Sequence, residues 1–175
     1  VSPFSLEAFP FKRVHAGPVN IYENPGVMPR AVAATRVVVL NSDGEVLDRM
    51  RRSDYRPSEQ VYVTAEEWAR TGAGCCPNAG DSLSAATIRI RDDGPNSVTI
   101  SATTGQPALL VLADTYYPGW KAFDNGREIP VLRVNHTLRG VLLEPGSHDI
   151  VFAFKPASLR IGACVTFIAA GLLLL

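Results

Sequence analysis

The chain has 175 residues, enough for one domain with a hydrophobic core or for a small domain joined to a membrane segment. Its 17 basic and 17 acidic side chains cancel to a formal net charge of zero. Because nucleic-acid binding requires clustered positive charge, the sequence argues against that class of protein. The 13 prolines and 14 glycines, mixed with β-branched and aromatic residues, favour a turn-rich β domain over a helical one.

The first part of the chain predicts short strands and two short helices. Strands are expected at 19–23, within 31–40 and at 60–64, where β-branched and aromatic residues gather. Ser42 is followed three residues later by Glu45, the capping pattern that begins helices, so a surface helix is expected at 44–51. Thr64 and Glu67 repeat the pattern and predict a helical turn that carries Trp68.

From residue 85 onward the strand pattern becomes regular. Seven strands are expected, at 87–91, 97–102, 109–112, 119–123, 127–134, 138–143 and 148–154. Strands spaced by roughly 8 to 12 residues with turn residues between them are typical of antiparallel sandwiches. The sequence therefore predicts a mainly β protein with an antiparallel, jelly-roll-like β-sandwich.

One stretch combines a core strand, an aromatic corner and a tight turn. Leu109 to Leu112 are uninterruptedly apolar and too few for a helix, so they predict a strand covered on both faces. Pro118-Gly119 follows among several aromatic residues and allows the chain to kink. Asn125-Gly126 is the strongest short signal for a hairpin, because both turn positions need positive φ.

The C-terminal tail differs in character from the rest of the chain. After Arg160 it is entirely uncharged and mostly apolar. Its composition favours the start of a transmembrane helix at 158–175, cut short, over a buried helix of a soluble domain. The sequence thus predicts a β domain at 1–157 and a membrane segment at 158–175, within a fragment of a longer protein and with membrane lipid as a partner.

The three cysteines do not form a disulfide framework, because an odd count leaves at least one unpaired. Cys75 and Cys76 are adjacent, and two ordinary thiols are favoured over a strained disulfide between them. No second Cys or His pair accompanies them at the spacing of a zinc site, so neither a metal nor a cofactor is expected.

The aromatic corner is the candidate binding feature. Tyr116, Tyr117 and Trp120 can form a platform on which sugar rings stack, and they are the candidate glycan-contacting residues. The alternative is that they plug one end of the sandwich, where Tyr and Trp bury large areas while their polar atoms find partners. This structural role is favoured over glycan contact.

The remaining polar residues predict no catalytic centre. Asp114 and Asp124 flank the corner and formally resemble a glycosidase carboxylate pair, but an Asp at the start of a hairpin is more often a turn residue. The three histidines show no metal-binding or catalytic spacing. His148 follows a Pro-Gly turn, where a hydrogen-bonding role at a strand start is expected.

The chain resembles the C-terminal region of the YfhO family of multi-span bacterial membrane proteins. The resemblance rests on Thr115 to Ala122, then Pro145-Gly146-Ser147-His148 and Phe154-Lys155-Pro156 ahead of an apolar helix. A second patch, Tyr22 to Pro25 with Met28 to Ala31, is similar to the family's upstream signature.

The resemblance implies a function that composition alone does not. YfhO-like proteins resemble membrane glycosyltransferases of the C-type fold, which use polyprenyl-phosphate sugars and modify cell-envelope glycans. The fragment is then expected to be an extracytoplasmic domain of a multi-pass protein in the bacterial cell membrane, with the catalytic residues elsewhere in the parent chain. Two alternatives remain, a non-catalytic carbohydrate-binding or assembly module and a soluble periplasmic binding domain.

Overall fold

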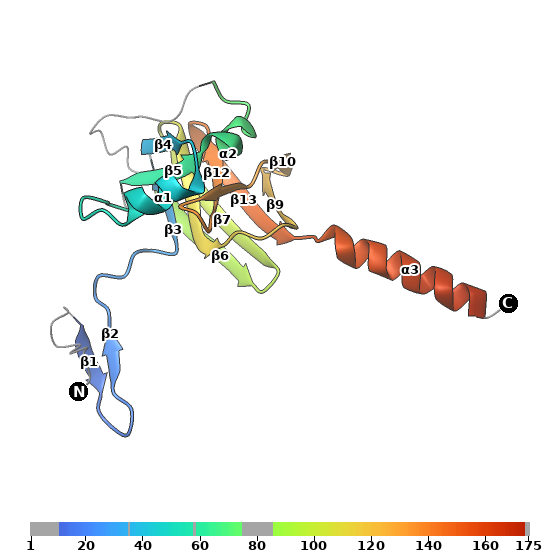
Figure 1. Ribbon diagram of the computed structural model, residues 1–175, viewed down its shortest axis with the longest axis horizontal. Helices are drawn as coiled ribbons and strands as arrows, with labels where there is room; N and C mark the ends of the chain where they lie inside the picture. The colour runs from blue at the N-terminus through green and yellow to red at the C-terminus, as the bar shows by residue number, and fades with distance from the viewer. Residues whose placement is uncertain (1–10, 35, 58, 75–85, 174–175) are drawn as a thin grey trace.

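The computed structural model describes residues 11–34, 36–57, 59–74 and 86–173, and β-strands dominate it (Figure 1). A five-stranded and a six-stranded sheet form its main body, and a two-stranded hairpin precedes them. The described residues also form three helices, α1 (Asp43–Met50), α2 (Ala65–Ala69) and α3 (Ala157–Leu173). The prediction of a mainly β protein is confirmed.

The five-stranded sheet is antiparallel throughout, in the order β10-β9-β13-β7-β6. Its strands are β6 (Thr87–Gly94), β7 (Ser97–Thr104), β9 (Trp120–Asp124), β10 (Arg127–Ile129) and β13 (Gly146–Phe154). Asn125 and Gly126 connect β9 to β10 with positive φ angles of 48° and 84°. The predicted Asn-Gly hairpin is therefore confirmed.

The six-stranded sheet has the order β3-β8-β12-β11-β5-β4. Its strands are β3 (Ala31–Ala34), β4 (Arg36–Leu40), β5 (Gln60–Thr64), β8 (Ala108–Thr115), β11 (Leu132–Val134) and β12 (Leu138–Leu143). All its pairs are antiparallel except β4 with β5, which is parallel. The expectation of a purely antiparallel sandwich is wrong at this pair, because α1 lies in the connection and gives the chain the crossover that parallel strands need.

Two of the predicted strands are each divided in two. The strand expected within 31–40 is β3 and β4, which pair with β8 and β5 respectively. The strand expected at 127–134 is β10 and β11, which lie in different sheets on either side of Pro130. Proline has no N–H to donate to a sheet, so the chain leaves one sheet there and enters the other.

The main hydrophobic core lies between the two sheets. Val98, Ile100, Ile150 and Phe152 of the five-stranded sheet pack with Leu110, Leu112, Val141 and Leu143 of the six-stranded sheet. A second cluster, built around Leu109, Val111 and Trp68, covers the other face of the six-stranded sheet. β8 is thus buried on both faces, as its apolar run predicted.

Both short helices begin as predicted. The Ser42 hydroxyl accepts a hydrogen bond from the Glu45 backbone N–H at 3.3 Å, and Thr64 accepts from Glu67 at the same distance. Helix α2 then turns Trp68 onto the outer face of the six-stranded sheet, where it is 8% exposed. The caps therefore fix the direction in which each helix leaves its strand.

Two elements extend away from the sandwich (Figure 1). The hairpin of β1 (Lys12–His15) and β2 (Ile21–Glu23) precedes it, and α3 follows it. Within the residues described, no helix is both long enough and apolar enough to cross a membrane. The predicted C-terminal helix is present over 17 residues, and its membrane crossing stays a prediction.

Candidate functional site

One end of the sandwich gathers the aromatic corner, the entry of the chain and its exit. β3 begins there, with Ala31 opposite Leu112, and β8 ends there at Thr115. β9 begins and β13 ends at the same end, where Trp120 pairs with Phe154. We call this end the base.

The base is closed by backbone contacts around Pro118-Gly119. The Lys155 N–H donates to the Gly119 carbonyl at 2.7 Å, and Gly119 has a φ of 109°. A Cβ at Gly119 would lie 3.1 Å from both the Phe154 ring and the Pro156 Cα atom. The position therefore requires glycine for its backbone angle and for space.

The three candidate glycan-contacting residues lie at the base but differ in their surroundings. Tyr117 is 62% exposed, and its ring centroid lies 6.3 Å from that of Phe154. Tyr116 is half-buried and packs against the main core, with its hydroxyl 3.5 Å from Arg70 Nη1. Trp120 is also half-buried, and its ring tilts against Phe154 at 5.3 Å. Tyr116 and Trp120 thus close the end of the core, and Tyr117 is the most exposed of the three rings.

Trp120 covers a buried charge. The Arg139 guanidinium carbon lies 3.8 Å from the centre of the Trp120 ring, and the Arg139 side chain is 3% exposed. Arg139 is on β12 of the six-stranded sheet, whereas Trp120 is on β9 of the other sheet. A desolvated cation over an indole ring contributes up to about 2 kcal/mol, so this contact joins the two sheets.

Asp114 is the counter-ion of Arg139. Its Oδ2 atom accepts from Arg139 Nη2 at 2.5 Å, and both of its oxygens accept from the Arg30 guanidinium at 2.8 Å. Arg30 also pairs with Asp93 at the end of β6. These four residues form the base ion network, which connects three strands of both sheets to the segment that enters β3.

The network holds Asp114 as a carboxylate. The hydrogen bonds from Arg30, with the nearby charge of Arg139, hold the Asp114 pKa below its usual range. Burial lowers the pKa of Arg139, although the charge of Asp114 opposes this, and an arginine remains charged in either case. Asp114 is therefore suited to hold two arginines in place and not to donate a proton.

This geometry coincides with a region shared with known proteins. The family model described as "Bacterial membrane protein YfhO" matches residues 76–166, just over half of the chain. The chain belongs to the YfhO family. The match spans β6 to β13 and the first part of α3, and thus includes Asp114, Trp120 and Arg139. Neither the curated proteins nor the solved structures gave a match.

Asp124, the second carboxylate near the corner, lies away from the base in this YfhO-family domain. It ends β9, four residues beyond Trp120, which is about 13 Å along a strand. Its Oδ2 atom lies 2.8 Å from His148 Nδ1, and it begins the Asn125-Gly126 turn. Asp124 is therefore a turn residue, as the sequence favoured, and the structure does not bring it together with Asp114 as a carboxylate pair.

His148 has the hydrogen-bonding role at a strand start that its position suggested. Its Nε2 atom lies 2.8 Å from the Glu144 carbonyl, and the side chain is 8% exposed. Both ring nitrogens thus lie within hydrogen-bonding distance of an oxygen atom. The Oδ1 atom of Asp124 is buried and lacks a hydrogen-bond partner among the described residues.

The His148→Phe variant is expected to lose about 1–3 kcal/mol of unfolding free energy, because it leaves the Asp124 carboxylate without its His148 partner. Urea unfolding of purified variants measures this loss. The double variant with Asp124→Ala should recover part of it. An unfolding free energy within error of the parent in His148→Phe would show that the contact contributes nothing to stability.

Sequence reasoning missed a second polar cluster, which surrounds Arg133 on β11 of the six-stranded sheet. Arg133 Nη2 donates to Asp43 at 2.9 Å, and its backbone N–H donates to Glu67 at 3.1 Å. Arg70 also donates to Glu67, at 2.8 Å. The hydrogen bond from Arg133 lowers the pKa of Asp43. The cluster ties α1 and α2 to β11, a structural role that spacing along the chain could not reveal.

The cysteines and the potential metal ligands form no site within the described residues. Cys75 and Cys76 lie outside the described residues, and Cys164 is an exposed free thiol on α3. Across the described ranges, no group of three His, Cys, Asp or Glu side chains is placed to hold a metal ion.

Proposed function

We propose that this chain is an extracytoplasmic domain of a multi-pass membrane protein, and that α3 begins a transmembrane helix. The exposure of α3 carries the proposal. Its large apolar side chains are 60–78% exposed, namely Leu159, Ile161, Val165, Phe167, Ile168 and Leu172. Burying side chains of this size away from water is worth about 1.5–3 kcal/mol each, so a helix that exposes six of them is suited to an apolar surrounding.

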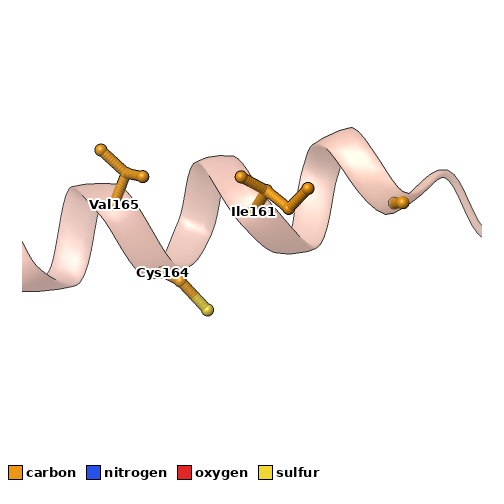
Figure 2. Close-up of a pocket in the computed structure, with 4 residues that line it drawn as sticks. Ile161, Cys164 and Val165 are labelled. Carbon is orange, nitrogen blue, oxygen red and sulfur yellow. The ribbon is translucent and has the colours of Figure 1, made fainter.

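Apolar side chains lie on more than one side of α3. Figure 2 shows Ile161, Cys164 and Val165, which line one hollow of the helix and share one side of it. Leu159 and Phe167, two positions before and six positions after Ile161, are exposed off that side. An amphipathic helix that packs on a soluble domain has one apolar stripe, whereas a membrane helix is apolar all round. The division into a β domain at 1–157 and a membrane segment at 158–175 rests on this contrast.

We further propose that the parent protein is a glycosyltransferase that uses a polyprenyl-phosphate sugar in cell-envelope glycosylation. Membership of the YfhO family supports this proposal. The catalytic residues then lie outside this chain, and the domain holds an envelope glycan at the base through Tyr116, Tyr117 and Trp120. The exposed ring of Tyr117 and the partly open ring of Trp120 are suited to stack on the C–H faces of sugars.

A non-catalytic carbohydrate-binding or assembly module is the second candidate. The observation that favours it is the state of Asp114, which two arginines hold as a carboxylate. The Asp114 carboxylate therefore has a structural role at the base. Under this alternative the same rings bind glycan, but the parent protein transfers no sugar.

Glycan binding by the full chain in detergent micelles tests the role of the base. In a Trp68→Phe background, Trp120 is the sole tryptophan reporter. Titration with envelope polysaccharide is expected to change its fluorescence saturably, and Tyr117→Ala should weaken binding by about 1–2 kcal/mol, or roughly tenfold, because one stacked ring is lost. Tyr22→Ala removes an aromatic side chain on β2 and is the matched control.

Calorimetry with Trp120→Ala complements this titration, because that variant removes the reporter. Loss of binding with an unchanged melting temperature would assign glycan contact to Trp120. If polysaccharide has no effect on the parent chain, and Trp120→Ala only lowers the melting temperature, the rings are a structural plug and the proposed glycan contact is wrong.

A further inference from the structure

The segment that leads from β2 into the sandwich and the segment that leads from it to α3 both join the sandwich at the base. The segment after β2 enters at Arg30, whose carbonyl accepts from the Ala113 N–H at 2.7 Å. The chain leaves at Phe154 and reaches α3 after Lys155 and Pro156. Figure 1 shows the linker from β2 and helix α3 both leaving the sheets, with the β6–β7 turn between them. A surface that borders α3 is the part of the domain that a membrane around α3 would reach first.

Apolar side chains are exposed along this same border. Val27 is 75% exposed and Met28 is 37% exposed on the segment that enters, and Tyr117 is 62% exposed on the corner. Single exposed apolar residues are ordinary, but these three lie next to the two connections of one end. Exposed apolar groups beside both the entry and the exit of the chain are suited to contact with a membrane.

The aromatic residues and the lysine beside α3 have the arrangement of a membrane interface. Phe154, three residues before α3, lies against the rings of both Tyr117 and Trp120, with tilted geometry and centroid separations of 6.3 and 5.3 Å respectively. Tyr and Trp are enriched at the level of lipid headgroups, because their rings are apolar and their tips are polar. The base therefore carries residue types that are found at the membrane–water interface, and α3 carries residue types that are found in the hydrocarbon layer.

Lys155 points its charge away from the helix. It lies two residues before α3, yet its ammonium group is 4.7 Å from the ring centre of Phe123, further along β9. Long basic side chains near the end of a membrane helix extend in this way to keep the charge in water. The Lys155 side chain thus places its charge beside the sheet, on the side expected to face water, and away from the apolar side chains of α3.

We propose that the base, through Val27, Met28, Tyr117, Trp120 and Phe154, rests in the headgroup layer of a lipid bilayer. This inference rests on the proposed membrane insertion of α3 and adds a second, peripheral contact between the sandwich and the membrane. It places the aromatic corner at the depth where the sugar of a lipid-linked donor is presented, so that the domain is held upright and close to the membrane surface.

The test uses the full chain, with its three cysteines replaced by serine, reconstituted in phosphatidylcholine and phosphatidylglycerol nanodiscs. A polarity-sensitive fluorophore is placed at one of three single cysteines, Tyr117→Cys at the base, Ile168→Cys on α3, or Thr103→Cys near the opposite end of β7. Nitroxides on the headgroup or deep in the acyl chain then quench each label, and iodide reports access from water. Melting temperatures check that each labelled variant is folded.

We expect headgroup nitroxide to quench the label at residue 117 several-fold more strongly than the label at residue 103. Acyl-chain nitroxide should quench the label at residue 168 most strongly. If the 168 label is quenched but the 117 label behaves like the 103 label, α3 is inserted and the base contact is wrong. Protection of the 117 label from both lipid nitroxides and iodide would mean that protein covers the base, and this also overturns the proposal. An unquenched label at residue 168 refutes the insertion of α3, and the base contact with it.

Discussion

The Asp114→Asn variant is expected to lose about 3–5 kcal/mol of unfolding free energy, because it leaves the charge of Arg139 buried without its counter-ion. Arg139 is 3% exposed, and its Nε and Nη1 atoms already lack hydrogen-bond partners among the described residues. The variant also removes the paired carboxylate oxygens that hold Arg30. Chemical denaturation of the variant and the parent measures the difference.

Two matched variants show whether the loss comes from the buried charge. Replacing both partners, Asp114→Asn with Arg139→Met, should recover much of the stability, because an apolar side chain needs no counter-ion. Asp149→Asn removes the exposed pair with Arg91 and should cost only about 0.2–1 kcal/mol. If Asp114→Asn costs no more than Asp149→Asn, the base ion network does not stabilise the fold.

The same network makes part of the stability depend on pH. Because the arginines lower the pKa of folded Asp114, its contribution is complete above the pKa of an unfolded aspartate, about 3.9. The contribution is lost as the pH falls through the lower pKa of the folded state. As the pH is lowered from 6 towards acid unfolding, the unfolding free energy of Asp114→Asn should therefore fall less steeply than that of the parent. Urea unfolding at several pH values measures both proteins. If the two unfolding free energies fall in parallel with pH, Asp114 is not the source of this dependence.

The Gly119→Ala variant is expected to lose about 2–4 kcal/mol, because its side chain meets both strain and a collision. The φ of 109° is one that L side chains rarely adopt, and the added Cβ would approach Phe154 and Pro156 at 3.1 Å. Both neighbours belong to the path from β13 into α3. The change should therefore also displace Trp120, which a shift of its fluorescence in a Trp68→Phe background reports.

Gly126→Ala separates the two causes of that loss. Its φ is also positive, at 84°, but an added Cβ there meets nothing within 4 Å. The Gly126→Ala variant should lose roughly 1–2 kcal/mol of unfolding free energy, the cost of a positive φ angle for a residue with a side chain. Equal losses in the two variants would show that the contacts of Gly119 with Phe154 and Pro156 contribute nothing beyond its backbone angle.

Local signals in the sequence predicted the local features of this fold well. The Ser42 and Thr64 caps and the Asn125-Gly126 turn depend on residues within a few positions of one another, so their chemistry is visible in the sequence. The buried strand β8 was equally visible from its apolar run. The division of the strand expected at 127–134 was not predicted, although Pro130 argues against one continuous strand there.

Pairings between distant residues could not be predicted. Arg139 appeared as one of many charges in the sequence, and its partners Asp114 and Trp120 are fixed by the packing of two sheets. The aromatic corner was recognised as a candidate site, but its relation to a buried arginine was not. Similarly, the side chain and backbone of Asn135 form hydrogen bonds with Tyr62 on β5, which no local pattern predicts. Asn135 and the adjacent His136 have positive φ angles of 45° and 68°.

The position of β3 has a consequence for the order in which the protein folds. Arg30, directly before β3, and Asp114, near the end of β8, are separated by 84 positions. During synthesis β3, β4 and β5 therefore emerge before β8, which pairs with β3, and β11 and β12 emerge later still and join β8 to β5. Contacts of such long range form slowly, because a large loop must close before they are gained. β3 therefore stays without its strand partner until β8 is made, whereas β4 and β5 can pair with each other before that.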